Sequence, residues 1–537
     1  MIKQTELFKE KKQDHHKADT YTGIYAMHKY WSKKPYNVVR DFIEKYSNQN
    51  DVVIDPFCGS GISVIESIIL GRKAIGIDIN PSAIFITEQM IRKINTNKVA
   101  NEFANIKAKI KQKIDSLYKV KRNGTIICAT HFVWEGEKLS EIWYSNGSKK
   151  KIVFEPTEED EINAREITLN DIPYFYPKNS FFHNSRINTK KVQKVFDLFT
   201  PRNLYALSLL YNEIEKIQNE EVKDFFKFVF TSSMGQSSRM VFIVKRRGKN
   251  NGHTLEKKEV GSWVIGYWTP KDFFEINVWK NYESRFKKII KAKNEQNYSN
   301  YVLKETKNIQ SILSKNYNLS LINKPAQNVL GEIPDNSIDY IITDPPHGDR
   351  IPYLELGILW NSWLQKDVNF NDEIIISNAK ERKKDIQNYN MLINKVYCQI
   401  YRILKPNKYF SLMFNSLDDK TWINLISYLT KIGFELLSVE TLGYSANSVV
   451  QDNRKKGLKT DFILTFKKTY CNSLDNIKIL TLNKDKDYLL KEINKIIDEK
   501  EHKEIYSLIN VIFKNFLQKK EFFKLSEVIK IINEKGI

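Results

Sequence analysis

The alternation of apolar and polar positions is clearest between residues 51 and 96. A short β-branched run, VVIDPF (52–57), is followed by GISVIESIIL (61–70), whose apolar residues recur at helical spacing. KAIGIDI (73–79) then has the continuous apolar character of a second buried strand, and another helical segment follows. This order predicts a β-α-β unit and therefore a parallel sheet.

A second strand-rich block begins at SIDYIITDPP (337–346). The pattern after it predicts a helix, a strand, a helix and two closing antiparallel strands, at 386–403, 409–415, 420–431, 435–444 and 461–468. The two blocks together indicate an α/β protein whose sheet is assembled from distant parts of the chain.

Residues 97–320 do not continue this alternation. They open with a long charged helix (97–118), followed by a hairpin-like segment at 125–146, a polar stretch to about 190 and mostly helical sequence. We interpret the region as an inserted domain. The tail from about 470 is amphipathic and rich in lysine, which predicts a small helical appendage. Four parts are expected, with bounds 1–96, 97–320, 321–468 and 469–537.

Composition narrows the classes of function. The formal net charge is +21, and an excess of positive charge attracts polyanions, although lysine-rich surfaces also arise without such a partner. No long apolar run exists and the N-terminal segment lacks the apolar core of a signal peptide, so we expect a cytoplasmic protein without membrane contact. The four cysteines form no CxxC pair, which argues against a disulfide framework and a cysteine zinc site.

The segment DPFCGSG (55–61) follows a predicted strand and opens a helix. Gly59 and Gly61 permit a tight turn and close approach of a ligand, and the helix N-terminus offers free amide donors. Such a turn would also fit a dinucleotide enzyme. However, Asp55 is badly placed for a pyrophosphate and well placed for a cationic amino-acid group, and Asp78 at the end of the next strand can accept hydrogen bonds from ribose hydroxyls.

The segment DPPHG (344–348) directly follows another predicted strand. Two successive prolines set a stiff, extended turn without backbone donors, so the Asp344 carboxylate and the Pro345 carbonyl become converging acceptors. An exocyclic amino group has two hydrogens to donate to such a pair. His347 would then face the ring and stack on it. A proline turn with a solvated aspartate is the alternative.

These two motifs resemble those of the DNA amino-methyltransferases. HKYWSKKP (28–35) resembles the N-terminal element of that family, which packs on the cofactor methionine, and RILKPNKYFSLMFN (402–415) resembles its LKPGG turn and following strand. The resemblance implies a class I methyltransferase (Rossmann-like) fold with a mixed seven-stranded sheet, and S-adenosylmethionine as cofactor. It implies cofactor contacts from Lys34, Pro35, Asp55, Pro56, Phe57, Cys58, Gly59, Ser60, Gly61, Asp78 and Ile79, and catalytic roles for Asp344, Pro345, Pro346 and His347.

Three features depart from the family pattern. His347 stands where adenine-N6 members usually have Tyr, Phe or Trp, and residues 323–330 lack the acidic residue that many relatives use for the cofactor adenine. The hairpin at 125–146 lacks the cysteine pairs with which some relatives bind zinc, so no metal is expected. Segments of the insertion, at 199–207, 237–240 and 277–286, resemble a subgroup of large bacterial DNA methylases.

The resemblance implies methylation of adenine N6 in double-stranded DNA, in a restriction or phage-defence system in which a cognate endonuclease is a possible partner. The base would have to leave the stack to reach the cavity. Recognition of the target is expected in the insertion, with Arg239, Arg246, Arg247 and Arg285 as candidates for contacts to DNA. Cytosine-N4 methylation, tRNA guanine-N2 methylation and a catalytically silent nucleic-acid-binding scaffold remain as alternatives. The recognition sequence and the oligomeric state stay open.

Overall fold

The computed structural model describes residues 15–145, 151–250, 253–297, 300–314, 316–348, 351–416, 419–443, 461–469, 478–498 and 505–534. Cys471 and the last residue of the predicted strand 435–444 lie outside these ranges. Within them, no helix is both long and apolar enough to cross a membrane.

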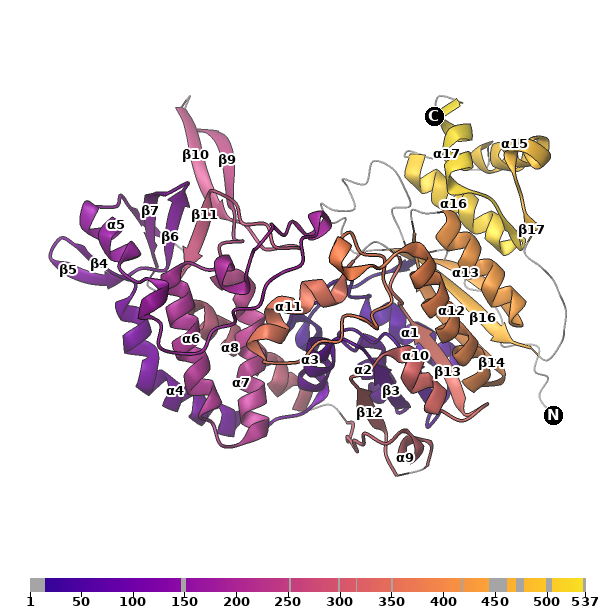
Figure 1. Ribbon diagram of the computed structural model, residues 1–537, viewed down its shortest axis with the longest axis horizontal. Helices are drawn as coiled ribbons and strands as arrows, with labels where there is room; N and C mark the ends of the chain where they lie inside the picture. Colours follow the sequence, from indigo (N-terminus) through magenta and orange to yellow (C-terminus); the bar gives the residue numbers. More distant parts are fainter. Residues whose placement is uncertain are drawn as a thin grey trace.

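One sheet of eight strands forms the centre of the right half of the molecule in Figure 1. Seven of its strands lie in the order β15-β16-β14-β13-β2-β3-β12, with β16 antiparallel to both of its neighbours. Their bounds are Phe434–Gly443, Asp461–Lys468, Leu404–Phe414, Ile338–Thr343, Val52–Asp55, Lys73–Ile77 and Leu319–Ile322. The predicted mixed seven-stranded sheet and its two closing antiparallel strands are confirmed. A short additional strand, β1 (His15–Lys17), pairs with the outer edge of β15 and was not predicted.

Apolar side chains alternate between the two faces of this sheet. Val53 and Ala74 point into one core, whereas their neighbours Ile54 and Ile75 point into the other, as the two-residue period of a strand requires. The first face is covered by α1 (Tyr36–Tyr46), α2 (Ile62–Ile69) and α3 (Pro81–Ile91), and α11 (Tyr353–Trp363) packs on α3. The second face is covered by α9 (Ile309–Leu313), α10 (Ala326–Val329), α12 (Ile386–Ile403) and α13 (Asp419–Lys431). Helices thus cover both faces, and the carboxyl ends of the parallel strands stay open.

The chain from α4 to α8 forms the left half of the molecule in Figure 1. Its helices are α4 (Thr96–Ser116), α5 (Glu158–Arg165), α6 (Pro201–Glu215), α7 (Glu220–Ser233) and α8 (Val278–Asn297). A four-stranded sheet has the order β11-β6-β7-β8, from Phe273–Ile276, His131–Glu135, Lys138–Tyr144 and Ile152–Phe154. This half of the molecule also contains two separate hairpins: β4 (Lys119–Arg122) pairs with β5 (Thr125–Cys128), and β9 (Ile243–Asn250) pairs with β10 (His253–Val260).

Several details of this region differ from the expectation. The predicted hairpin at 125–146 is divided, because β5 pairs with β4 while β6 pairs with β7. The strands β9, β10 and β11 lie where mostly helical sequence was expected. β12 was missed because its four residues are too short to give a clear period.

The C-terminal residues form a small helical unit with α15 (Leu482–Asp498), α16 (Ile505–Gln518) and α17 (Leu525–Glu534). Two short strands, β17 (Lys478–Ile479) and β18 (Glu521–Phe522), pair beside them. Phe513 of α16 packs edge-on against Trp422 of α13, with ring centroids 4.9 Å apart. The unit therefore shares its core with the second face of the sheet (Figure 1, yellow).

Candidate active site

A cavity opens at the carboxyl ends of β2, β3 and β13. It holds about 900 Å³ of empty space including its mouth, a size suited to a ligand of several hundred daltons. Most of its walls come from six stretches of chain: 30–34, 55–60, 78–79, 325–327, 342–346 and 372–374, of which Pro345 alone does not line it. Single residues complete the lining: Val39, Ile62, Ser63, Tyr353 and Met413. The two sequence motifs, almost 300 residues apart, therefore face one shared space, at the sheet edge where open α/β proteins bind ligands.

The glycine-rich turn has the conformation that its sequence predicts. Gly59 and Gly61 have φ angles of 51° and 75°, in the left-handed region that side chains disfavour. A Cβ at Gly61 would lie 2.2 Å from Cγ2 of Thr87, and one at Gly59 would lie 3.1 Å from the Tyr30 ring. Gly61 directly precedes α2, so the turn delivers the chain into a helix N-terminus beside the cavity.

The two carboxyl groups of this wall are held by neutral donors. Asp55 Oδ1 accepts hydrogen bonds from the Thr343 hydroxyl (2.6 Å) and the Phe57 amide (3.0 Å), and the Ser63 hydroxyl donates to Oδ2. Burial raises the pKa of Asp55 to about 6, although these hydrogen bonds oppose the shift. Asp55 thus joins β2 to β13. Its predicted contact with a cationic ligand group stays a prediction.

Asp78 fastens the glycine turn to the end of β3. Its carboxylate accepts from the backbone amides of Gly59 and Asn80, each at 2.8 Å. Burial raises the pKa of Asp78 to about 7. A carboxylate can accept roughly four hydrogen bonds, so these two leave capacity for hydroxyl donors in the cavity.

Asp344 on the opposite wall is surrounded by basic groups. Lys34 Nζ lies 3.1 Å from Asp344 Oδ2 and 2.6 Å from Asp461 Oδ2, and His347 Nε2 lies 2.9 Å from Asp344 Oδ1. Lys34 and Asp461 are buried, at 8% and 6% exposure. Lys34, predicted as a cofactor residue, lines the cavity and contacts the predicted catalytic carboxylate. No sequence motif pointed to Asp461, since 427 residues separate it from Lys34.

His347 does not line the cavity, in contrast to its predicted position. Its ring packs edge-on against Phe414, with centroids 4.8 Å apart, and Nε2 lies 3.2 Å from the Met413 carbonyl. The aromatic rings on the cavity wall include those of Tyr30 and Tyr353, stacked with centroids 6.3 Å apart. These two tyrosines come from the N-terminal element and α11, and no motif singled them out as ring-stacking residues.

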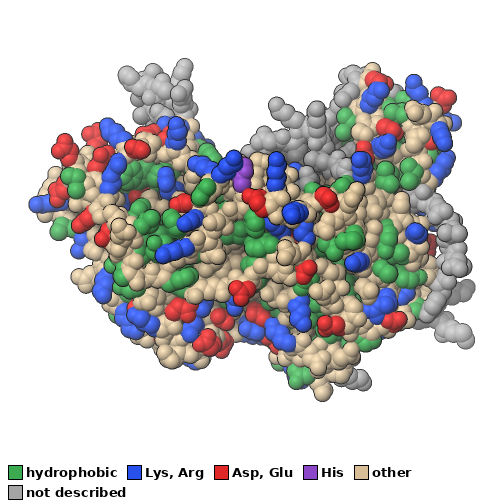
Figure 2. All heavy atoms as spheres, viewed as in Figure 1, with side chains coloured by type: hydrophobic (Ala, Val, Ile, Leu, Met, Phe, Trp, Pro, Cys, Tyr) green, Lys and Arg blue, Asp and Glu red, His purple; other side chains and the backbone are tan. Residues whose placement is uncertain are grey.

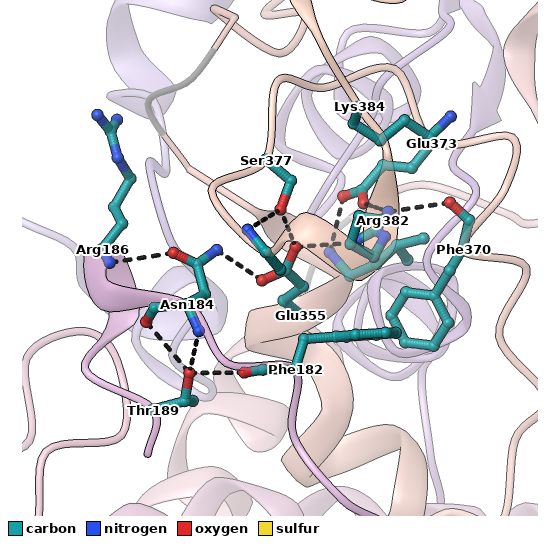
Figure 3. A network of polar contacts seen from close by, with 12 residues as sticks. Phe182, Asn184, Arg186, Thr189, Glu355, Phe370, Glu373, Ser377, Arg382 and Lys384 are labelled. Atoms are coloured by element: carbon teal, nitrogen blue, oxygen red, sulfur yellow. Dashed lines mark hydrogen bonds and ion pairs between the residues drawn. The ribbon is translucent and has the colours of Figure 1, made fainter. Parts of the chain in front are cut away.

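A buried network links the insertion to the cavity wall (Figure 3). Arg382 donates to Glu355 at 2.8 Å and to Glu373 at 2.6 Å. Its guanidinium lies 5.4 Å from the ring centroid of Phe182 and 5.0 Å from that of Phe370, and these two rings contact each other edge to face. Asn184 of the insertion donates to the second oxygen of Glu355 at 2.6 Å. Glu373 also lines the cavity. The position of the insertion is therefore fixed relative to the site by groups that are almost fully buried.

The arginines predicted to contact DNA occupy different environments. Arg239 lines a groove on the insertion, whereas Arg246 is exposed on β9 and paired with Glu259 at 2.8 Å. Arg285 donates to the Ser232 carbonyl at 3.2 Å, and burial lowers the pKa of its guanidinium. The side chain of Arg247 lies outside the described residues. Of these four arginines, Arg239 is therefore the one that lines a groove and whose guanidinium forms no ion pair within the described chain.

The strand order and the cavity at the strand ends define a class I methyltransferase fold. Residues 3–89 match the family model described as DNA methylase. The Type II methyltransferase M.MjaII of Methanocaldococcus jannaschii is 25% identical over 207 residues, 37% of each chain. The Type II methyltransferase M.EcaI of Enterobacter cloacae is 38% identical over 74 residues, 14% of this chain and 15% of that one. These matches confirm the resemblance to the DNA amino-methyltransferases.

The aligned parts cover well under half of these relatives. The solved structure of TTHA0409 from Thermus thermophilus aligns with 31% of this chain and 60% of its own, at 12% identity and a TM-score of 0.17.

Proposed function

We propose that this protein transfers a methyl group from S-adenosylmethionine to the N6 amino group of adenine in double-stranded DNA. One observation carries the proposal: Asp344 and the glycine turn line the same cavity. One wall can hold a nucleoside-like cofactor, and the other presents acceptors for an amino group.

The residues of the first wall fit S-adenosylmethionine. Asp78 has acceptor capacity for two ribose hydroxyls, and the turn at Gly59 and Gly61 leaves no side chain between backbone and ligand. Lys34 and Ser60 also line the cavity, and we assign them to the amino-acid group of the cofactor. When bound, the cofactor supplies a methyl group on a sulfonium, which a neutral amine can attack.

The second wall would orient that amine. A carboxylate oxygen of Asp344 accepts one hydrogen bond from the amino group. The Pro345 carbonyl accepts the other: Pro345 itself does not line the empty cavity, but it lies between the lining residues Asp344 and Pro346. The two hydrogen bonds turn the nitrogen lone pair out of conjugation with the ring. Lys34 keeps the carboxylate oriented through their ion pair. As positive charge develops on the nitrogen, the nearby carboxylate stabilises it and accepts the proton that the nitrogen releases.

Adenine is proposed because an aspartate precedes the two prolines, whereas the cytosine-N4 members of the resembled family more often have serine there. The two relatives named above are Type II methyltransferases, which supports a role in restriction and modification with an endonuclease as partner. Tyr30 and Tyr353 line the cavity and are suited to stacking on a planar ring, whereas His347 does not line it.

The test is incubation of the purified protein with DNA of mixed sequence and S-adenosylmethionine carrying a labelled methyl group, followed by mass spectrometry of the nucleosides. We expect labelled N6-methyladenosine in its deoxy form. Labelled N4-methylcytosine would correct the target base. Label found in RNA guanine alone, or in no nucleic acid, would refute the proposal.

A further inference from the structure

The insertion carries a groove with an excess of positive charge. Four cations line it, accompanied by a single carboxylate, Asp197: the cations are Lys190, Lys191, Arg239 and Lys271. None of the four takes part in an ion pair with another described residue, whereas Lys245 and Arg246 on the hairpin of β9 are both paired with glutamates. Unpaired cations in a groove are suited to the phosphates of a nucleic acid.

Arg239 is held rigidly at this groove. Its guanidinium lies 5.0 Å from the centroid of the Phe273 ring, and its backbone amide donates to the Leu198 carbonyl at 2.8 Å. Its Nε is buried, so the terminal nitrogens of the guanidinium are the donors that remain for a ligand in the groove. A guanidinium fixed in this way is suited to a phosphate oxygen.

A strained apolar residue stands at the lip of the same groove. Val192 is 86% exposed, more than any other large hydrophobic side chain that the structure describes. Its φ angle is 62°, in a region that β-branched residues normally avoid. Neither burial nor backbone preference explains a valine here. Strain of this kind clusters at functional sites.

The turn that presents Val192 is firmly closed. The Lys190 amide donates to the side-chain oxygen of Gln193 at 2.9 Å, and the Phe181 amide donates to the Gln193 carbonyl at 2.9 Å. Gln193 is itself only 6% exposed. The valine therefore projects from a rigid support.

The same segment is anchored beside the active-site cavity. Phe182 packs on Arg382, and Asn184 donates to Glu355 within the network of Figure 3. In Figure 2, Lys and Arg side chains gather at the upper edge of the molecule, between the hairpin at upper left and the C-terminal helices at upper right. The turn 190–193 begins six residues after Asn184, so the network holds it close in the chain to the wall of the cavity.

We propose that the groove and the turn 190–193 form a clamp for duplex DNA. Lys190, Lys191 and Arg239 contact phosphates, and Val192 inserts between base pairs where the target base leaves the stack. Apolar wedges of this kind compensate for the unstacking that base extrusion requires. This inference rests on the proposed function, because only an extruded base leaves a gap to fill.

The first test compares methyl transfer into two duplexes that carry the mapped target site. One is fully paired, and the other has an abasic position opposite the target base, which makes extrusion easy. Val192→Gly removes the side chain and suits the backbone conformation, so folding is preserved. We expect it to slow transfer about tenfold on the paired duplex and to match wild type on the abasic duplex. Val302→Gly, at another exposed valine, should change neither rate.

If Val192→Gly transferred methyl groups at the wild-type rate on both duplexes, or were slowed equally on both, the proposed wedge role of Val192 would be overturned. Absence of transfer by the wild-type protein would instead overturn the proposed function.

The second test needs no catalysis. Affinity for a labelled duplex is measured by fluorescence anisotropy over a range of salt concentrations. Replacing both Lys190 and Lys191 with alanine should lower the slope of log affinity against log salt by about 1.8, the effect of two lost phosphate contacts. The control replaces Lys216 and Lys223, which are paired with glutamates on α6 and α7. An unchanged slope, or tighter binding of RNA than of the duplex, would overturn the clamp.

Discussion

The carboxyl groups on the two walls of the cavity lie in opposite environments. Asp55 and Asp78 are buried among neutral hydroxyl and amide donors, and burial raises the pKa of each. Asp344 lies instead between two basic side chains, Lys34 and His347. The first arrangement builds a turn and leaves room for a ligand. The second holds a carboxylate in a fixed place, as stabilisation of a developing positive charge requires.

The strongest test of this difference is removal of the Asp344 carboxylate. Asp344→Ala should reduce methyl transfer by at least about a thousandfold, because the charge that we propose to face the reacting nitrogen is lost. Binding of S-adenosylmethionine, measured by calorimetry, should stay near that of the wild type, since the groups of the first wall are unchanged. Substantial residual turnover would show that the two walls do not differ in this way.

The support between insertion and cavity can be broken at Arg382. Arg382→Ala would leave Glu355 and Glu373 as buried carboxylates without their cation, at a cost of about 3–5 kcal/mol in the free energy of unfolding. Lys45→Ala, which removes an exposed ion pair with Glu440, should cost less than about 1 kcal/mol. Denaturant unfolding measures both. Equal destabilisation by the two variants would mean that burial of the network does not matter.

Sequence patterns predict the first wall better than the second. The turn at Gly59 and the strands around it are encoded within about 30 consecutive residues, where apolar periods and glycine positions act locally. The contact of Lys34 with Asp461 joins segments that are far apart in the sequence, so no periodic pattern predicts it. His347 was expected at the cavity from its place in the motif, but packing against Phe414 decides its orientation.

The same distinction explains the errors in the insertion. The strand β9 reads IVKRRGKN, a charged sequence without two-residue alternation, and it is formed through pairing with β10. β12 has only four residues, but the sheet supplies β3 beside it. The network around Arg382 draws on residues from 182 to 382, so only the folded chain reveals it.

Asp461 offers a way to test the second wall without touching the reacting groups. Lys34 forms ion pairs with both Asp461 and Asp344. Asp461→Asn keeps the shape of the side chain but removes one of these two ion pairs. We expect kcat to fall by about tenfold with little change in KM, because Lys34 would be held less firmly against the catalytic carboxylate. Asn415 also donates to Asp461, at 3.1 Å, so unfolding should be measured in parallel. A change in stability alone, with kcat unaltered, would assign Asp461 a purely structural role.

The smallest expected effect is a pH dependence of cofactor binding that arises from Asp78 on the first wall. The pKa of Asp78 is raised to about 7, so the free protein holds this carboxyl largely protonated at about pH 6 and largely ionised at about pH 8. If ribose hydroxyls donate to the ionised form, protons compete with the ligand below the pKa, and affinity for S-adenosylmethionine should fall by about tenfold between about pH 8 and about pH 6. The same raised pKa makes the contribution of Asp78 to stability decrease as pH rises from about 4 to about 7, because the native state then binds more protons than the unfolded state. Calorimetry at both pH values, on the wild type and on Asp78→Asn, separates the effects. The variant should bind more weakly at the higher pH and lose most of the pH dependence, whereas an unaltered pH profile would place the titrating group elsewhere in the cavity.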